Sequence, residues 1–212
     1  MGTNSDLEKR SYTFEARAEK GDNGKNVIVG RPIVYEQKTD LGFFDEIIER
    51  GALDKTDLRD VRFLVNHDIS RIPLARSRRN NENSTMQLTV DKDGMGIRVT
   101  LDTENNADAR ALYSAVERGD ISGMSFMFSV KRDAWDDLES DHPTRRVKEI
   151  GTVVEVSAVT FPAYEQTEIG TRCKTALDNA RAALDSAREQ RGNVDTSGLE
   201  LEKLKAKYLY NI

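Results

Sequence analysis

Segments in which apolar and polar residues alternate with a period of two, each bounded by turn signals, recur through most of the chain and predict β-strands. The clearest is 124–131 (Met-Ser-Phe-Met-Phe-Ser-Val-Lys), in which a Met/Phe face alternates with a face that carries Ser125. The segments 86–90 and 96–101 are expected to form one hairpin, and 146–150 and 152–161 a second, closing hairpin. Three further strands are predicted at 10–18, 26–35 and 61–67.

One segment inside this β-rich region has helical periodicity instead. Between Asn106 and Arg118 the apolar residues recur at intervals of three and four, and Gly119 follows where a helix C-cap is expected. Many short strands with a single internal helix predict an α+β fold that is mainly β. We expect an antiparallel β-barrel-like core, which removes exposed strand edges, with flanking helices and a helical C-terminal tail.

The composition changes at both ends of the chain and suggests three regions. Residues 1–9 are polar and are expected to form a disordered leader. Residues 10–170 carry the predicted strands and form the folded domain, since ~150 residues bury enough apolar surface to fold without staples. Residues 171–212 are rich in Ala, Arg, Asp, Glu and Lys and are expected to be a helical tail.

Charge and residue counts argue against several classes of protein. The 212 residues contain 32 Lys and Arg against 37 Asp and Glu, a net charge of −5, which disfavours nucleic acid as the main partner. The longest apolar runs are far shorter than the ~20 residues of a membrane span. Cys173 is the single cysteine and His67 and His142 are the two histidines, so we expect no disulfide and no metal site. Neither common glycine-rich phosphate motif occurs, so we expect no cofactor.

Two residues on predicted strands are candidates for acid–base and nucleophilic chemistry. His67 continues the apolar face of 61–67, as a shielded general base would, although a hydrogen-bonded core or edge histidine gives the same pattern. Ser125 follows Gly123, which permits the close backbone approach that a nucleophile needs. A serine on the polar face of a strand, however, usually has no catalytic role. Ser122 is the local competitor for the same role.

A third candidate is Glu155, which interrupts the apolar segment 153–159. An unpaired buried carboxylate costs several kcal/mol, so this residue faces water, pairs with a cation or accepts a hydrogen bond from an imidazole. A serine, a histidine and a carboxylate are the residue types of a nucleophile, a base and an orienting group. Their order along the chain, His67, Ser125, Glu155, differs from those of chymotrypsin, subtilisin and the α/β-hydrolases.

Residues 10–165 resemble the prohead (procapsid maturation) proteases of tailed phages, a serine-protease family that is distantly similar to the herpesvirus assemblins. The similarity is spread over five blocks in the family's order, and each block alone is weak. The blocks are Ile28-Val29-Gly30-Arg31-Pro32-Ile33-Val34-Tyr35, Phe44-Asp45-Glu46-Ile47-Ile48 leading to Gly51-Ala52-Leu53, Phe63-Leu64-Val65-Asn66-His67-Asp68, Asp120-Ile121-Ser122-Gly123-Met124-Ser125-Phe126, and Glu155-Val156-Ser157-Ala158-Val159-Thr160-Phe161-Pro162-Ala163-Tyr164.

The resemblance implies a role for each candidate: His67 as catalytic base, Ser125 as nucleophile and Glu155 as third member. The assemblins use a second histidine as third member, which here is His142, in a polar segment that reads as a loop, so we favour Glu155. The chain departs from the family at Met127, where Gly is frequent. It also departs at 73–76, where Arg76 is either an aid to the oxyanion or a solvated residue.

The resemblance also implies substrates and a location. The expected activity is that of a serine endopeptidase that cleaves the scaffold protein, the major capsid protein precursor and itself, inside the procapsid in the host cytoplasm. Residues 171–212 then resemble a scaffold-binding or targeting tail, with a plain solvated helix as the alternative. Self-association into a homo-oligomer is left open, because no heptad run is long enough to decide. The other class of function is a non-catalytic structural β-barrel protein of the virion, associated with the capsid or tail tube.

Overall fold

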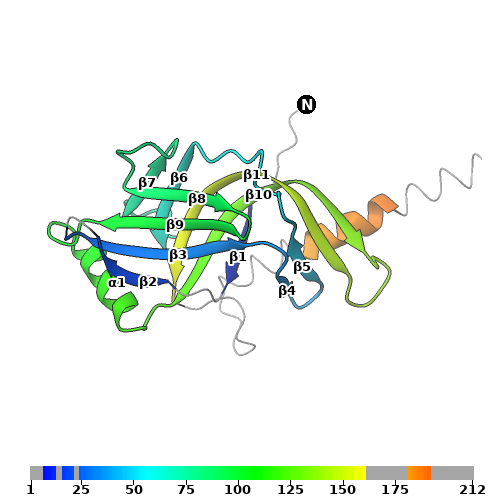
Figure 1. The fold of residues 1–212 in the computed structure, drawn as a ribbon. Helices are drawn as coiled ribbons and strands as arrows, with labels where there is room; N and C mark the ends of the chain where they lie inside the picture. Colours follow the sequence, from blue (N-terminus) through cyan, green and yellow to red (C-terminus); the bar gives the residue numbers. More distant parts are fainter. Residues whose placement is uncertain (1–6, 13–15, 22–23, 161–180, 192–212) are drawn as a thin grey trace, which may run out of the picture.

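The computed structural model describes residues 7–12, 16–21, 24–160 and 181–191 (Figure 1). Two sheets form the fold and one labelled helix packs beside them, so the α+β, mainly β prediction is confirmed. The elements are β1 (Leu7–Tyr12), β2 (Arg17–Lys20), β3 (Asn26–Val34), β4 (Lys38–Asp40), β5 (Asp45–Ile48), β6 (Asp60–Val65), β7 (Ala75–Arg78), β8 (Met86–Asp91), β9 (Gly94–Leu101), α1 (Ala107–Glu117), β10 (Gly123–Asp136) and β11 (Thr144–Val159).

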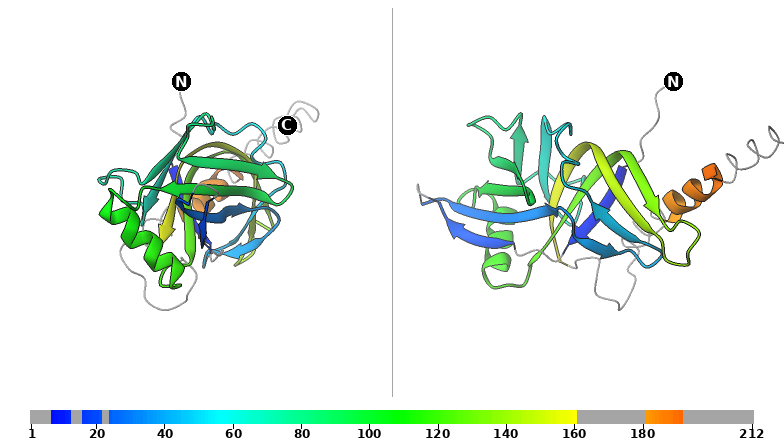
Figure 2. Two further views of the ribbon diagram at one scale, coloured as in Figure 1. Left: turned by 60° about the vertical axis from the view of Figure 1, so that its left-hand side comes forward. Right: turned by 45° about the vertical axis from the view of Figure 1, so that its right-hand side comes forward.

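The larger sheet has seven strands and is built around β11. Its strand order is β1-β10-β11-β5-β4, and β6 and β7 continue from the other end of β11. The smaller sheet has the order β2-β3-β9-β8 and is antiparallel throughout. Seen end-on, the strands curve around a common centre (Figure 2), but the two sheets are not joined into a closed barrel.

The expectation that the sheet is antiparallel is wrong at two places. Both β5 and β6 run parallel to β11, one beside its start and the other beside its end. The turn between these two strands fills the gap, because Ile150 donates to the Ala52 carbonyl and Asp57 donates to the Gly151 carbonyl, each at 2.9 Å. Such pairings between distant segments leave no periodic signal in the sequence.

The predicted closing hairpin within 146–161 is also wrong, because β11 is one continuous strand of 16 residues. Its hairpin partner is β10, which is itself 14 residues long. Gly151 is a bulge in this ladder and not a turn, since Ser129 pairs with Thr152 and the next pair skips to Ile150. A Cβ at Gly151 would lie 2.8 Å from the Ser129 hydroxyl oxygen, so the glycine reflects close packing.

The apolar faces of the two sheets pack against each other and form the main core. Its largest fully buried side chains include Phe63, Phe126 and Phe128 from the larger sheet, and Ile28 and Met95 from the smaller one. Burying each phenylalanine is worth roughly 1.5–3 kcal/mol. The predicted apolar strand faces are therefore the faces that make the core.

The helix predicted over 106–118 is confirmed at both ends by α1. The Asn106 side chain accepts hydrogen bonds from the N–H groups of Asp108 and Ala109, which is an N-cap. At the other end Gly119 has a φ of +80°, and its N–H donates to the Val116 carbonyl, as in a Schellman cap. Among the described residues, no helix has both the length and the apolar character that crossing a membrane requires.

The structure describes only part of the predicted leader (1–9) and part of the predicted tail (171–212). Residues 7–9, expected in a disordered leader, belong to β1 instead, while residues 1–6 lie outside the described part. Of the predicted tail, 181–191 is helical, and Leu184 packs with Phe44 and Leu138. The 170/171 boundary, Cys173 and the other tail residues lie outside the described residues, so the three-region division stays a prediction.

Candidate active site

The turn that carries His67 begins where β6 ends. The strand stops at Val65, and Asn66 and His67 have φ angles of 52° and 57°, in the left-handed region that non-glycine residues seldom adopt. The prediction that His67 continues the strand is therefore wrong. The end of β11 holds the turn, because Asn66 donates to the Ala158 carbonyl at 2.9 Å and its side chain bonds Thr160.

The structure brings His67, Ser125 and Glu155 into one hydrogen-bonded chain. His67 Nε2 lies 2.6 Å from Ser125 Oγ, and His67 Nδ1 lies 2.5 Å from Glu155 Oε1. Ser125 is completely buried, Glu155 is 3% exposed and the His67 side chain 15% exposed. Ser125 and Glu155 therefore lie inside the molecule, and Glu155 does not face water as a barrel-exterior glutamate would.

Strand register explains why the three side chains meet. In the antiparallel pair of β10 and β11, Ser125 lies opposite Ser157 and Met127 lies opposite Glu155. Residues two apart on a strand share a face, so Glu155 and Ser157 point to the same side of β11. The parallel pair of β6 and β11 aligns Leu64 with Ser157, and the turn that follows carries His67 back over this side.

The Ser125 hydroxyl has a second partner on β1. Its Oγ donates to the Arg10 carbonyl oxygen at 2.7 Å, across the β1–β10 ladder. The same oxygen lies 2.6 Å from His67 Nε2, so Ser125 Oγ contacts the β1 backbone and the imidazole together.

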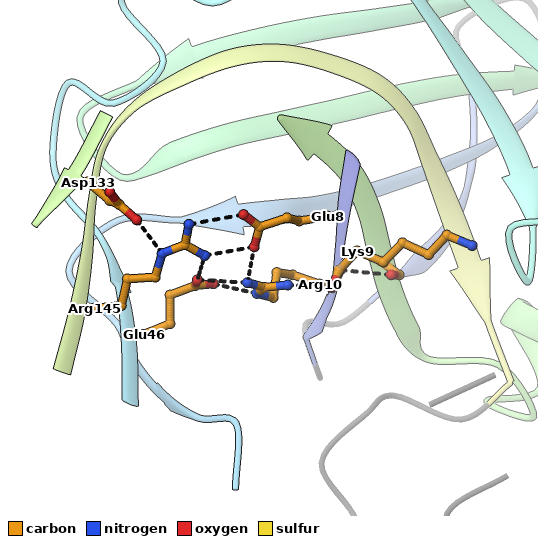
Figure 3. A network of polar contacts seen from close by, with 7 residues as sticks. Glu8, Lys9, Arg10, Glu46, Asp133 and Arg145 are labelled. Carbon is orange, nitrogen blue, oxygen red and sulfur yellow. Dashed lines mark hydrogen bonds and ion pairs between the residues drawn. The ribbon is translucent and has the colours of Figure 1, made fainter. Parts of the chain in front are cut away.

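A buried network of charges fixes β1 beside β10, the strand that carries Ser125 (Figure 3). Arg10 bonds Glu8 and Glu46, and Arg145 on β11 bonds the same two carboxylates and Asp133. Burial alone would raise the pKa of Glu8, but the two guanidinium groups outweigh it and hold that pKa below its usual value. The backbone carbonyl that contacts Ser125 is thereby held in place.

The residues considered as alternatives for the nucleophile, the oxyanion aid and the third member of the site do not join this hydrogen-bonded chain in the described structure. Ser122 is exposed, and the Arg76 guanidinium is held by Asp60, with its Nε 2.6 Å from Oδ1, rather than directed at an oxyanion. His142 is 41% exposed and lies 3.2 Å from an oxygen of Asp45.

Three side chains of the types that bind metals form a cluster that does not include His67, Ser125 or Glu155. Single ligand atoms of Asp40, Asp45 and His142 lie within 4.8 Å of one another. The Lys38 ammonium already pairs with Asp45, and the pKa of Asp45, which burial would raise, is held below its usual value by Lys38 and His142. We therefore interpret the cluster as a surface ion-pair group, and assign it no metal.

A cavity of about 410 Å³ adjoins the turn that carries His67. Asn66 and Asp68, on either side of His67, contribute to its wall, and Leu64, Leu112 and Ile121 give it apolar surface. Ile72, also in the wall, is 84% exposed. The candidate site thus borders a concave, partly apolar surface.

Sequence reasoning missed two contributors to this site. Ser157 bonds both Glu155 and the backbone of His67, and its signals in the sequence were its place in the fifth family block and on the same strand face as Glu155. The Arg10 carbonyl had no signal, because a backbone contact across 115 residues depends on strand pairing alone.

Comparison with known proteins gives three similarities. The family model described as caudovirus prohead serine protease matches residues 12–181. The prohead protease of Enterobacteria phage HK97 is 29% identical over 153 residues, which cover 70% of this chain and 61% of that protein. The structure of the bacteriophage T4 capsid assembly protease has a TM-score of 0.46 and 14% identity, and covers 74% of this chain and 98% of its own.

Proposed function

Because the chain belongs to the caudovirus prohead serine protease family, we propose that it is a serine endopeptidase of procapsid maturation. Ser125 is the nucleophile, His67 the general base and Glu155 the orienting carboxylate. The observation that carries the proposal is the continuous hydrogen-bonded chain from the Ser125 hydroxyl through the His67 ring to the Glu155 carboxylate.

The proposed reaction follows from the roles of these groups. Ser125 Oγ attacks the scissile carbonyl carbon while His67 Nε2 takes its proton, and the imidazolium then gives that proton to the leaving amine. Water hydrolyses the acyl-enzyme by the same steps and restores the serine. Glu155 accepts the Nδ1 hydrogen throughout, which fixes the ring orientation and stabilises the imidazolium.

The resting arrangement must change before attack. A hydroxyl has one hydrogen, which Ser125 can give either to the Arg10 carbonyl or to His67 Nε2, and proton transfer requires the hydrogen bond to His67. Ser125 is also completely buried, so a substrate carbonyl reaches it only if the residues that cover it move. The described conformation therefore fits an enzyme at rest.

We propose three substrates: the scaffold protein, the N-terminal region of the major capsid protein precursor, and the protease itself. Self-cleavage would remove part of the 171–212 segment, which we propose as the scaffold-binding or targeting tail. The reaction would take place inside the procapsid in the host cytoplasm, and association of the protease with itself is compatible with this setting.

A substitution at the nucleophile tests the proposal. In co-expression with the scaffold and capsid precursor, Ser125→Ala is expected to reduce cleavage of both, and of the chain itself, by at least about a thousandfold. Gel analysis and intact-mass spectrometry measure the products, and circular dichroism checks that the fold is kept. The matched control is Ser122→Ala, at an exposed serine three residues away, which should cleave like the wild type.

Two outcomes would overturn the proposal. One is full proteolysis by the Ser125→Ala variant. The other is the absence of any cleavage by the wild type together with stable incorporation into capsids or tails, which would favour the structural role instead.

A further inference from the structure

Ser157 occupies the centre of the candidate site without belonging to the triad. It is completely buried on β11, directly opposite Ser125 in the β10–β11 ladder. Its hydroxyl donates to Glu155 Oε2 at 2.6 Å and accepts the backbone N–H of His67 at 3.0 Å. One side chain therefore touches two of the three proposed catalytic residues.

We propose that Ser157 is a positioning residue of the protease. Its hydroxyl holds the Glu155 carboxylate and the His67 backbone in the relative positions that the hydrogen bond between Glu155 and the His67 ring requires. This inference rests on the proposed function and deepens it. Ser157 acts through Glu155 and His67, and no contact with the reacting atoms is assigned to it.

The contact with Glu155 fixes the carboxylate. Glu155 Oε1 faces His67 Nδ1 and Oε2 faces Ser157, so both oxygens are engaged in a residue only 3% exposed. Without the hydroxyl, Oε2 would lose a hydrogen bond in a site that water hardly reaches, which costs more than the same loss at the surface. The carboxylate would then turn to find another partner and misalign the ring nitrogen that it orients.

The contact with His67 fixes the base. His67 has a φ of 57°, so its N–H is turned out of the β6 ladder, and a side-chain oxygen satisfies it. Left-handed backbone at a non-glycine residue is unfavourable and persists only where surrounding contacts determine it. Ser157 supplies one of those contacts at the residue that moves the proton.

The test compares Ser157→Ala with a matched control elsewhere in the chain. Ser77 on β7 is equally buried, and its hydroxyl has no hydrogen-bond partner among the described atoms, so Ser77→Ala removes a buried hydroxyl without a contact. We expect Ser157→Ala to lower kcat by about ten- to hundredfold with KM changed less than about twofold, as loss of a hydrogen bond to a charged group predicts. Ser77→Ala should leave both constants unchanged.

Two readouts separate positioning from a merely structural role. The acidic limb of the kcat/KM profile against pH should move in Ser157→Ala, and the deshielded proton resonance between His67 Nδ1 and Glu155 should shift or broaden. Both should stay unchanged in Ser77→Ala. Ser157→Thr keeps the hydroxyl and should recover most of the activity, which gives a second variant should Ala weaken the fold.

A double-mutant cycle tests whether the effect passes through Glu155. In a Glu155→Gln background, Ser157→Ala should lower kcat by less than about threefold, because the group it positions is already lost. Multiplicative effects of the two substitutions, or an active Ser157→Ala enzyme with wild-type kcat and an unchanged proton resonance, would overturn the inference. A wild type that cleaves nothing would instead count against the proposed function, and the two failures are thereby distinguishable.

Discussion

At the scale of single residues, the side chains that bond a buried carboxylate determine whether that carboxylate suits a structural or a catalytic role. Glu155 and Glu46 are 3% and 1% exposed, so both need partners that replace water. Glu46 meets the guanidinium groups of Arg10 and Arg145, which stay charged and hold strands together. Glu155 meets an imidazole and a hydroxyl, and an imidazole can gain and lose a proton near neutral pH. The same side chain is structural in one setting and suited to catalysis in the other.

The first prediction at this scale concerns Glu155 as the third member of the proposed catalytic triad. Glu155→Gln is expected to lower kcat by roughly a thousandfold or more, because an amide there cannot stabilise the imidazolium and favours the wrong tautomer of His67. His142→Ala should leave kcat within about twofold, since its ring pairs with Asp45 on the surface. Steady-state cleavage of a precursor-derived peptide measures both, and a large loss confined to His142→Ala would show that the assignment to Glu155 is mistaken.

At the scale of elements, the β8–β9 hairpin depends on one glycine. Gly94 has a φ of +136°, and a Cβ there would lie 2.0 Å from the Ile33 carbonyl oxygen of β3. The clash is with backbone, so no side-chain rotation can relieve it. Gly119, after α1, also has a positive φ of +80°, but a Cβ there would meet nothing within 4 Å.

Replacing each of these two glycines by alanine is predicted to lower the free energy of unfolding by a different amount. Gly94→Ala should lower the free energy of unfolding by more than about 3 kcal/mol, because β3 and β9 must separate to admit the methyl group. Gly119→Ala should cost only about 1 kcal/mol, the price of a left-handed alanine. Urea unfolding followed by circular dichroism compares them, and equal losses in the two variants would contradict this account of Gly94.

At the scale of the whole molecule, the buried charge network connects β1 with β5, β10 and β11 and so joins the N-terminal strand to the centre of the larger sheet (Figure 3). Breaking one member leaves its partners charged in a site without water, which is strongly destabilising. The same network holds the Arg10 carbonyl next to Ser125. Residues of β1 therefore contribute both to the charge network and to the contacts of Ser125.

The network predicts how stability depends on pH. The pKa of Glu8 in the folded state lies below its ordinary 4.5, so its contribution is complete above that pH and is lost as pH falls through the lower, folded-state pKa. We expect the free energy of unfolding to drop steeply on acidification below about 4. Glu8→Gln should cost about 3 kcal/mol at pH 7 and make the acid limb shallower.

Urea titrations between pH 2.5 and pH 7 measure this limb. The control is Asp120→Asn, which removes an exposed ion pair with Arg118 and should leave the curve almost unchanged. An acid limb equally steep in Glu8→Gln and in the wild type would assign the acid sensitivity to other carboxylates.

The sequence by itself determined features that depend on neighbours along the chain. Period-two alternation located β6, β8, β9 and much of β10, and Asn106 and Gly119 marked the ends of α1 because caps act within a few residues. Two of the three candidate residues also stood out in the pattern, since His67 continues an apolar face and Glu155 interrupts an apolar segment, whereas Ser125 lies on a polar face where a serine is ordinary. Their neighbourhood in space was expected from family resemblance, not from periodicity.

Only the tertiary structure decided how those segments pair and what surrounds the site. The left-handed turn at His67, the bulge at Gly151 and the parallel pairing of β11 with β5 and β6 all depend on hydrogen bonds between distant parts of the chain. The contacts that build the site join residues 58, 88, 90 and 115 positions apart. Local pattern cannot encode such contacts, because it carries the conformational preferences of neighbouring residues, whereas the register between strands is set by packing of the whole core.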